Sequence, residues 1–149
     1  MAQIIMKLCT YIATLGPVGY LPAPGTMGSL ATLPLVYAIS SLFMLDQCIF
    51  ILFFSIISYF AIKKALPYFV SHDPSHIILD EVIGCLVTFI GIDFSCQSLV
   101  VGFFLFRLFD ILKPFGIKNI EKIGGAWGVI LDDVIAGLFA NIILRLLIV

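Results

Sequence analysis

Five acidic side chains lie at the ends of apolar stretches of this chain, and their types and spacing are suited to chemistry. Carboxylate oxygens are ligands that Mg²⁺ prefers, and proteins commonly share the ion between carboxylates and a substrate phosphate. Acids in apolar surroundings are costly, so proton sharing, pairing with Lys or Arg, or a bound divalent cation must neutralise them. The five residues are Asp80, Glu81, Asp110, Asp132 and Asp133.

The composition of the chain predicts a membrane protein. Of its 149 residues, 62% are hydrophobic and 11% are charged, and the mean hydropathy is +1.20. A soluble domain has about 25% charged residues, and a chain this short buries too little surface to hide so many apolar side chains. We therefore expect an all-α, polytopic membrane bundle that forms a single domain over residues 1–149.

Composition also excludes other classes of protein. The net charge is −1 and no run of basic residues occurs, so nucleic acid is not an expected partner. The four cysteines are far apart in the sequence, which argues against a disulfide framework or a zinc site.

Apolar and Gly/Pro patterns divide the chain into predicted elements. Residues 1–15 have the pattern of an amphipathic helix that lies at the membrane interface or packs on the bundle. Residues 16–29 are rich in Gly and Pro, which predicts a loop without regular helix. About five hydrophobic helices follow in a bundle over residues 28–149, several of them shorter than the roughly 20 residues of a typical span. The predicted segments are 28–45, 47–66, 77–92, 96–112 and 126–149.

The basic residues predict how the bundle is oriented. The side of the membrane richer in Lys and Arg faces the cytoplasm, and in the five-span topology only Arg145 falls on the other side. Acids up to 53 residues apart then reach one cytoplasmic edge, and Trp127 is an interface anchor there. The basic residues on the cytoplasmic side are Lys7, Lys63, Lys64, Arg107, Lys113, Lys118 and Lys122.

Helical geometry predicts how adjacent acids divide their roles. Neighbouring helical residues point about 100° apart, so one acid of each adjacent pair is expected to bind an ion directly. The other acid would bind a second ion, contact a group that binds the first ion, or transfer a proton. The predicted metal ligands are Asp80, Glu81, Asp132 and Asp133.

One alternative concerns the same acids, and one further pattern concerns the helices that contain them. The acids could instead pair with Arg107, Lys113 and Lys122 and cap helix ends. Gly84 and Gly137 each follow an acid by four residues, and small residues at such positions allow membrane helices to approach closely.

Other residues are suited to binding a phosphate group. Arg107 and Lys113 lie on one helical face with Asp110, where they would bind phosphate or reach lipid headgroups. The glycine-rich segment 24–30 leads into the first hydrophobic helix, and helix N-termini bind anions through backbone N–H groups. Its candidate contacts are Gly25, Thr26 and Ser29.

Two histidines lie before the third hydrophobic segment. His72 and His76 flank Asp73-Pro74, and they are either polar interface residues and helix caps or a phosphate contact and proton donor.

Four motifs in order resemble the phosphatidylglycerophosphatase A family. They are PGTMGSL at 24–30, LDEVIG at 79–84, FRLFDILKP at 106–114 and GVILDDVIAG at 128–137. The likeness covers residues 16–140, and one departure is Phe115-Gly116-Ile117, where family members often have a second proline. The resemblance implies a Mg²⁺-dependent integral membrane phosphatase that converts phosphatidylglycerophosphate to phosphatidylglycerol. Its implied catalytic residues are Asp80, Glu81, Asp110, Lys113, Asp132 and Asp133.

The expected reaction is hydrolysis of a lipid phosphate monoester at the cytoplasmic face of a bacterial inner membrane. A carboxylate such as Glu81 would orient water, or an aspartate would attack directly. The main alternative is a small transporter coupled to protons or cations, although transporters hold such acids near the midplane. A CDP-alcohol phosphotransferase is disfavoured because the D-G-x-x-A-R motif is absent, and a scaffold protein would not need five acids at one depth.

Overall fold

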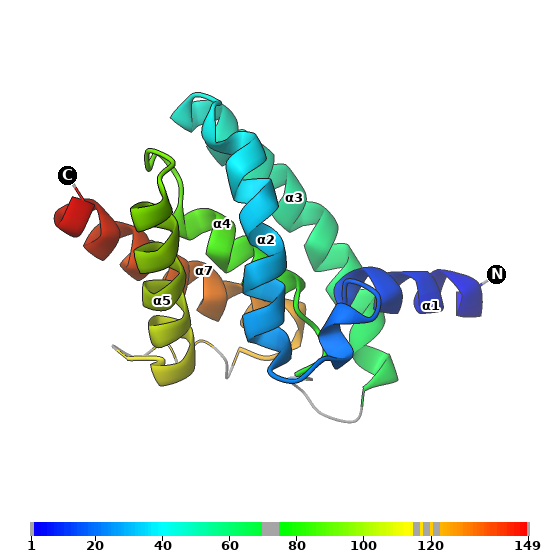
Figure 1. Ribbon diagram of the computed structural model, residues 1–149. Coiled ribbons are helices and arrows are strands. Elements are labelled where there is room, and N and C mark those ends of the chain that lie inside the picture. Colours follow the sequence, from blue (N-terminus) through cyan, green and yellow to red (C-terminus); the bar gives the residue numbers. More distant parts are fainter. Residues whose placement is uncertain (1, 70–74, 115–116, 118–119, 121–122, 149) are drawn as a thin grey trace.

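The computed structural model of this protein is helical throughout the residues that it describes, which are 2–69, 75–114, 117, 120 and 123–148. The predicted all-α class is confirmed for these residues. In Figure 1, α1 lies across the direction of α2, whereas α4 and α7 lie next to each other. The elements are α1 (Ala2–Ala13), the 3₁₀ turn η1 (Val18–Tyr20), α2 (Pro24–Ser40), α3 (Met44–Ala65), the 3₁₀ turn η2 (Leu66–Tyr68), α4 (Leu79–Thr88), α5 (Cys96–Leu112) and α7 (Gly125–Ile148).

Helix α2 begins earlier than the Gly/Pro pattern predicts. Residues 16–29 were expected to lack regular helix, yet α2 starts at Pro24. Proline is tolerated in the first turn because its missing N–H would have no partner there, and Ala23 turns the chain into the helix with a left-handed φ of 53°. Gly25 and Thr26 therefore belong to the first turn of α2 and not to a loop.

Helices α4 and α7 pack with their backbones in contact. A Cβ atom built on Gly84 would lie 2.6 Å from the carbonyl oxygen of Asp133, and one on Gly137 would collide with the carbonyl oxygen of Gly84. Only glycine fits at both positions, so the predicted close approach of these two segments is confirmed. Each glycine lies one helical turn after an acid, which means that this contact also brings the acids together.

The other end of α4 is held by polar side chains of α7. Asn141 Nδ2 donates to the carbonyl oxygens of Thr88 at 2.8 Å and Ile90 at 3.0 Å. Arg145 Nη2 donates to the Ile90 carbonyl at 2.7 Å. Because the last carbonyls of a helix have no partner within it, the bond to Thr88 stabilises the end of the short helix α4, and the bonds to Ile90 hold the turn that follows it.

One segment of the described residues, Met44–Tyr68, is long and apolar enough to cross a membrane, with a mean hydropathy of 2.0. Helices α2 and α5 have 17 residues each and α4 has 10. Helix α7 has 24 residues but contains Asp132, Asp133 and Arg145. The polytopic topology is therefore not confirmed by helix length and composition.

We expect Gly137→Ala to destabilise the fold by about 1–3 kcal/mol, the usual cost of overpacking a close contact. The added methyl group would meet the Gly84 carbonyl and push α4 away from α7. Thermal unfolding of the purified protein in detergent, followed by circular dichroism, measures the effect. Leu138→Ala is the control, because Leu138 is on the same helix and 48% exposed. Equal stability of Gly137→Ala and the native protein would show that the helices do not depend on this contact.

Candidate active site

A cavity of about 360 Å³ lies where α2, α4, α5 and α7 meet. The first turn of α4, the last turn of α5 and the N-terminal half of α7 all contribute acids to it. The structure thus brings together all six residues that the sequence nominated as catalytic. The polar and glycine residues that line the cavity are Gly25, Thr26, Ser75, Asp80, Glu81, Arg107, Asp110, Lys113, Asp132 and Asp133.

Three of the acids form a tight cluster. One carboxylate oxygen from each of Asp80, Glu81 and Asp133 lies within 4.8 Å of the other two. Asp80 and Asp133 are buried, and Asp80 Oδ1, Glu81 Oε2 and Asp133 Oδ2 have no hydrogen-bond partner among the described residues. Buried oxygens without partners are costly, and like charges this close repel each other.

This donor set fits a hard divalent cation. Three carboxylate oxygens within reach of one point match the oxygen ligands that Mg²⁺ takes, and its remaining positions are usually filled by water and substrate phosphate. Of the four predicted metal ligands, Asp80, Glu81 and Asp133 are in the cluster.

Asp132, the fourth predicted metal ligand, faces a lysine. Its Oδ2 lies 2.5 Å from Lys113 Nζ, and its Oδ1 accepts a hydrogen bond from the Asp133 N–H at 3.1 Å. The two adjacent aspartates of α7 therefore have different surroundings, as expected for side chains that point about 100° apart.

Asp110 also has a basic partner. Arg107 Nη1 lies 2.6 Å from Asp110 Oδ2, one turn away on α5. The alternative in which acids pair with Lys and Arg thus describes Asp110 and Asp132, while the other three acids lie together.

Lys113 reaches the site because the chain turns sharply there. Its φ of 44° is left-handed, and its N–H closes the end of α5 by donating to the Phe109 carbonyl at 2.9 Å. Pro114 follows, and a proline disfavours the helical conformation of the residue before it. The helix therefore ends at Leu112, the end of the predicted segment 96–112, and the lysine ammonium contacts α7.

The first turn of α2 closes the cavity from the other side. A Cβ atom on Gly25 would collide with Glu81 Oε1 and would lie 3.0 Å from both terminal nitrogens of Arg107. Glycine therefore permits α2 to approach the acids. The first intrahelical bond joins the Met27 N–H to the Ala23 carbonyl, so earlier N–H groups are available to an anion at this helix N-terminus.

Two predicted residues lie outside the cavity. Ser29 is buried, and its hydroxyl donates to the Gly25 carbonyl at 2.8 Å. His76 Nδ1 lies 2.9 Å from the Gly19 carbonyl oxygen, and its ring stacks on Tyr20 with the ring centroids 4.8 Å apart. These contacts give both side chains structural roles.

Some predicted residues cannot be placed, and one lining residue was missed. His72, Lys118 and Lys122 lie outside the described residues. Ser75 lines the cavity, although the sequence analysis did not nominate it. The only feature of the sequence that could have indicated Ser75 was its hydroxyl group in the short segment that leads to Asp80.

The fold and site define a class of protein, a helical bundle whose acidic cluster faces a cavity lined with Lys and Arg. Comparison with known proteins identifies the family. The chain belongs to the phosphatidylglycerophosphatase A family, whose family model matches residues 11–148.

Three individual relatives also match the chain, and two of them have the name of this family. Phosphatidylglycerophosphatase A of Haemophilus influenzae is 37% identical over 127 residues, which are 82% of this chain and 77% of that protein. The Escherichia coli protein of the same name is 34% identical over 120 residues, 78% of this chain and 69% of that protein. A Bacteroides thetaiotaomicron protein, described as a candidate phosphatidylinositol-3-phosphatase, is 36% identical over 75 residues, 48% of this chain and 47% of that protein. No solved structure matches the chain, and the comparisons do not support a transporter.

We expect Mg²⁺ to raise the melting temperature of the purified protein, because a ligand that binds only the folded state stabilises it by about 2.7 kcal/mol at 100 times its Kd. Asp133→Asn should remove most of this response, since it deletes a charge of the three-acid cluster. Thermal unfolding with and without Mg²⁺ measures both effects. Asp46→Asn is the control, because Asp46 is exposed in the first turn of α3. A melting temperature that ignores Mg²⁺, or a response retained by Asp133→Asn, would contradict a cation site here.

Proposed function

We propose that this protein hydrolyses the terminal phosphate monoester of phosphatidylglycerophosphate, releasing phosphatidylglycerol and inorganic phosphate, in a Mg²⁺-dependent reaction. The observation that carries the proposal is the cluster of Asp80, Glu81 and Asp133 beside Lys113 and Arg107 in one cavity. Membership of the phosphatidylglycerophosphatase A family and the names of the two longer matches support the same reaction.

Separate groups around the cavity suit the two parts of this task. Asp80, Glu81 and Asp133 would hold Mg²⁺, which when bound would polarise the phosphoryl group and neutralise developing negative charge. Lys113 and Arg107 would bind phosphate oxygens, Arg107 through two parallel hydrogen bonds and Lys113 as a point charge. The first turn of α2 would add backbone N–H groups to the same phosphate.

The hydrolysis needs a nucleophile and a route for one proton. Glu81 would use one carboxylate oxygen for the cation, and its other oxygen is our choice to orient water and accept its proton as the new P–O bond forms. The P–O bond to the lipid glycerol breaks, and the proton that the carboxylate took from water passes to the leaving oxygen to complete phosphatidylglycerol. Attack by an aspartate would instead form a phosphoryl-enzyme that water must cleave in a second step.

The membrane setting of the proposal rests on exposed apolar side chains. Phe53 of α3 is 65% exposed, Phe104 of α5 is 66% exposed and Leu146 of α7 is 76% exposed. Large exposed apolar surfaces of this kind are suited to lipid. We therefore assign a multi-pass topology in a bacterial inner membrane, in which neighbouring helices cover the acids of α7.

The cytoplasmic orientation of the cavity follows from the lysines at the end of α3. Tyr59 lies one turn before Lys63, and its ring centroid is 4.7 Å from that of Trp127 near the start of α7. Lys63 and Lys64 therefore lie at the end of the bundle where α7 begins, and Trp127 precedes Asp132 by five residues. The positive-inside rule assigns this end to the cytoplasm.

We expect Asp80→Asn and Asp133→Asn each to lower kcat for phosphate release by at least about 100-fold, the cost typical of removing one group that stabilises transition-state charge. Release of inorganic phosphate from phosphatidylglycerophosphate in detergent, with Mg²⁺ or with a chelator, measures the effect. The chelator should abolish activity of the native protein, and Asp46→Asn should leave it unchanged. Near-native turnover in either cluster variant would remove that residue from the mechanism.

The same measurement tests the substrate. Phosphatidate and phosphatidylinositol 3-phosphate are the comparison lipids, the latter because a relative is described as acting on it. A preference for either of them over phosphatidylglycerophosphate would contradict the proposed substrate while leaving the phosphatase chemistry in place.

We expect Cys96 to react with a membrane-impermeant maleimide added outside the inner membrane. Cys96 is exposed at the start of α5, and Lys113 of the cavity follows the other end of the helix. A cysteine introduced as Ser75→Cys, with Cys96 replaced by serine, should react only after the inner membrane is permeabilised. Cys9 and Cys48 are replaced by serine in both proteins. Labelling in the reverse order would place the cavity on the periplasmic side.

A further inference from the structure

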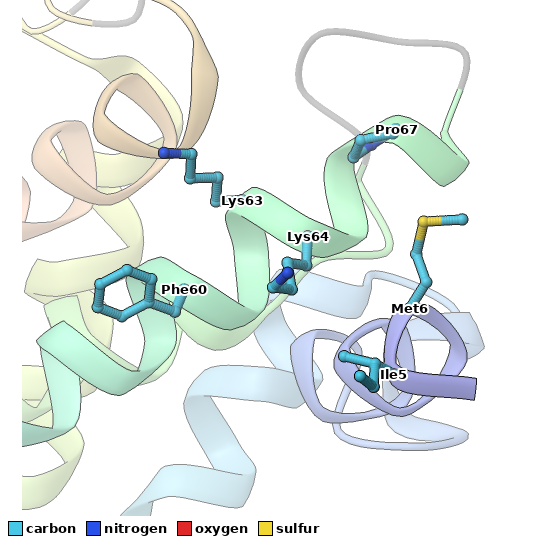
Figure 2. A pocket seen from close by; sticks show the side chains of 6 residues that line it. All are labelled: Ile5, Met6, Phe60, Lys63, Lys64 and Pro67. Carbon is cyan, nitrogen blue, oxygen red and sulfur yellow. The ribbon is translucent and has the colours of Figure 1, made fainter. Parts of the chain in front are cut away.

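A second and larger cavity lies between α1 and the end of α3, away from the acids. Its volume is about 570 Å³, and its lining shares no residue with that of the acidic cavity. Figure 2 shows side chains from both helices around it. The lining residues are Ile5, Met6, Phe60, Lys63, Lys64 and Pro67.

Two lysines give this groove a positive rim. Lys63 and Lys64 are both exposed in the last turn of α3, and they leave the helix in different directions (Figure 2). No ion pair joins either lysine to another residue in the described part of the chain. Lys63 Nζ lies 5.6 Å from the centroid of the Tyr59 ring, a contact that leaves its charge uncompensated. The charge of this rim complements an anionic group.

The remainder of the groove is apolar. Ile5 of α1 and Phe60 of α3 are exposed hydrophobic side chains, and Met6 lies beside Ile5. A flexible methionine next to aliphatic and aromatic groups adapts well to a chain of variable shape. The volume falls in the range of pockets that bind small ligands, about 300–1,000 Å³. One charged end and one apolar body match a phospholipid better than a free phosphate.

Aromatic residues indicate the level of the groove relative to a bilayer. Tyr68 follows the lysines in η2 and is exposed, and Trp127 packs against Tyr59 while remaining 54% exposed. Tyr and Trp gather at headgroup level in membrane proteins, and lysines there extend toward lipid phosphates. A lipid with its headgroup at this level would have its acyl chains along Phe60, toward the middle of α3.

We infer that the groove between α1 and α3 is a binding site for one anionic diacyl phospholipid. The positive rim of Lys63 and Lys64 attracts its anionic headgroup, and Ile5 and Phe60 contact an acyl chain. The site is separate from the acidic cavity, so its occupancy does not depend on the proposed hydrolysis. It gives α1 a function, because this helix completes the groove against α3.

Native mass spectrometry of the full chain, released from nanodiscs that contain equal amounts of phosphatidylglycerol and phosphatidylcholine, tests this site. The native protein should retain one phosphatidylglycerol in preference to phosphatidylcholine. Each lysine near a membrane surface contributes about fivefold in affinity for anionic lipid, so Lys63→Gln with Lys64→Gln should lower retention by about 25-fold.

Two further variants separate the parts of the site. Lys7→Gln is the charge control, because Lys7 is exposed on α1 but lines a different cavity with Thr10 and Tyr11. It should retain the lipid. Phe60→Ser keeps both lysines but should weaken retention through the lost acyl contact. Phosphate release by all variants reports on folding, since none of these residues lines the acidic cavity.

Three results would overturn the inference. One is retention of phosphatidylglycerol by the double lysine variant at the native level, and another is equal retention of phosphatidylglycerol and phosphatidylcholine by the native protein. The third is displacement of the lipid by glycerol phosphate at concentrations that match those of the lipid, which would show that the groove recognises a free phosphate compound.

Discussion

The backbone contact between α4 and α7 determines the geometry of the whole site. Gly84 and Gly137 let the helices approach until a single added methyl group would collide with a carbonyl oxygen. Each glycine lies one turn from an acid, so the contact that packs the helices also sets the distance between Asp80 and Asp133. Side-chain volume anywhere along this contact would separate the carboxylates, and a cation site depends on their separation within tenths of an ångström.

Charge is divided unevenly within the acidic cavity. Asp110 and Asp132 are neutralised by Arg107 and Lys113, whereas Asp80, Glu81 and Asp133 have buried oxygens without partners. An arrangement of this kind is unfavourable by itself, because burial and repulsion both oppose it. A bound cation would relieve both costs, and Arg107 and Lys113 line the same cavity as the three acids.

The short helix α4 connects the two ends of the molecule. Asn141 holds its last carbonyl, Arg145 holds the Ile90 carbonyl just beyond it, and its first turn carries Asp80 and Glu81. The acidic cavity and the lipid groove are separate, but Trp127 and Tyr59 link the start of α7 to the lysines of α3. A phospholipid held at Lys63 and Lys64 would therefore lie at the bundle end that also contains the acids.

The sequence alone indicated most of the helical segments and the set of acids that gather, because apolar length and charge placement are local properties. The segment predicted at 96–112 is α5 as observed, and the spacing of Gly84 and Gly137 indicated the α4–α7 contact. Tertiary structure decided which acid of each pair faces the cluster, since helix rotation is set by packing against neighbours. It therefore gave Asp132 and Asp133 different surroundings. It also directed the Ser29 hydroxyl to the Gly25 carbonyl of the same helix, away from the cavity. It also started α2 at Pro24, because only the folded chain shows that Gly25 must pass close to Glu81 and Arg107.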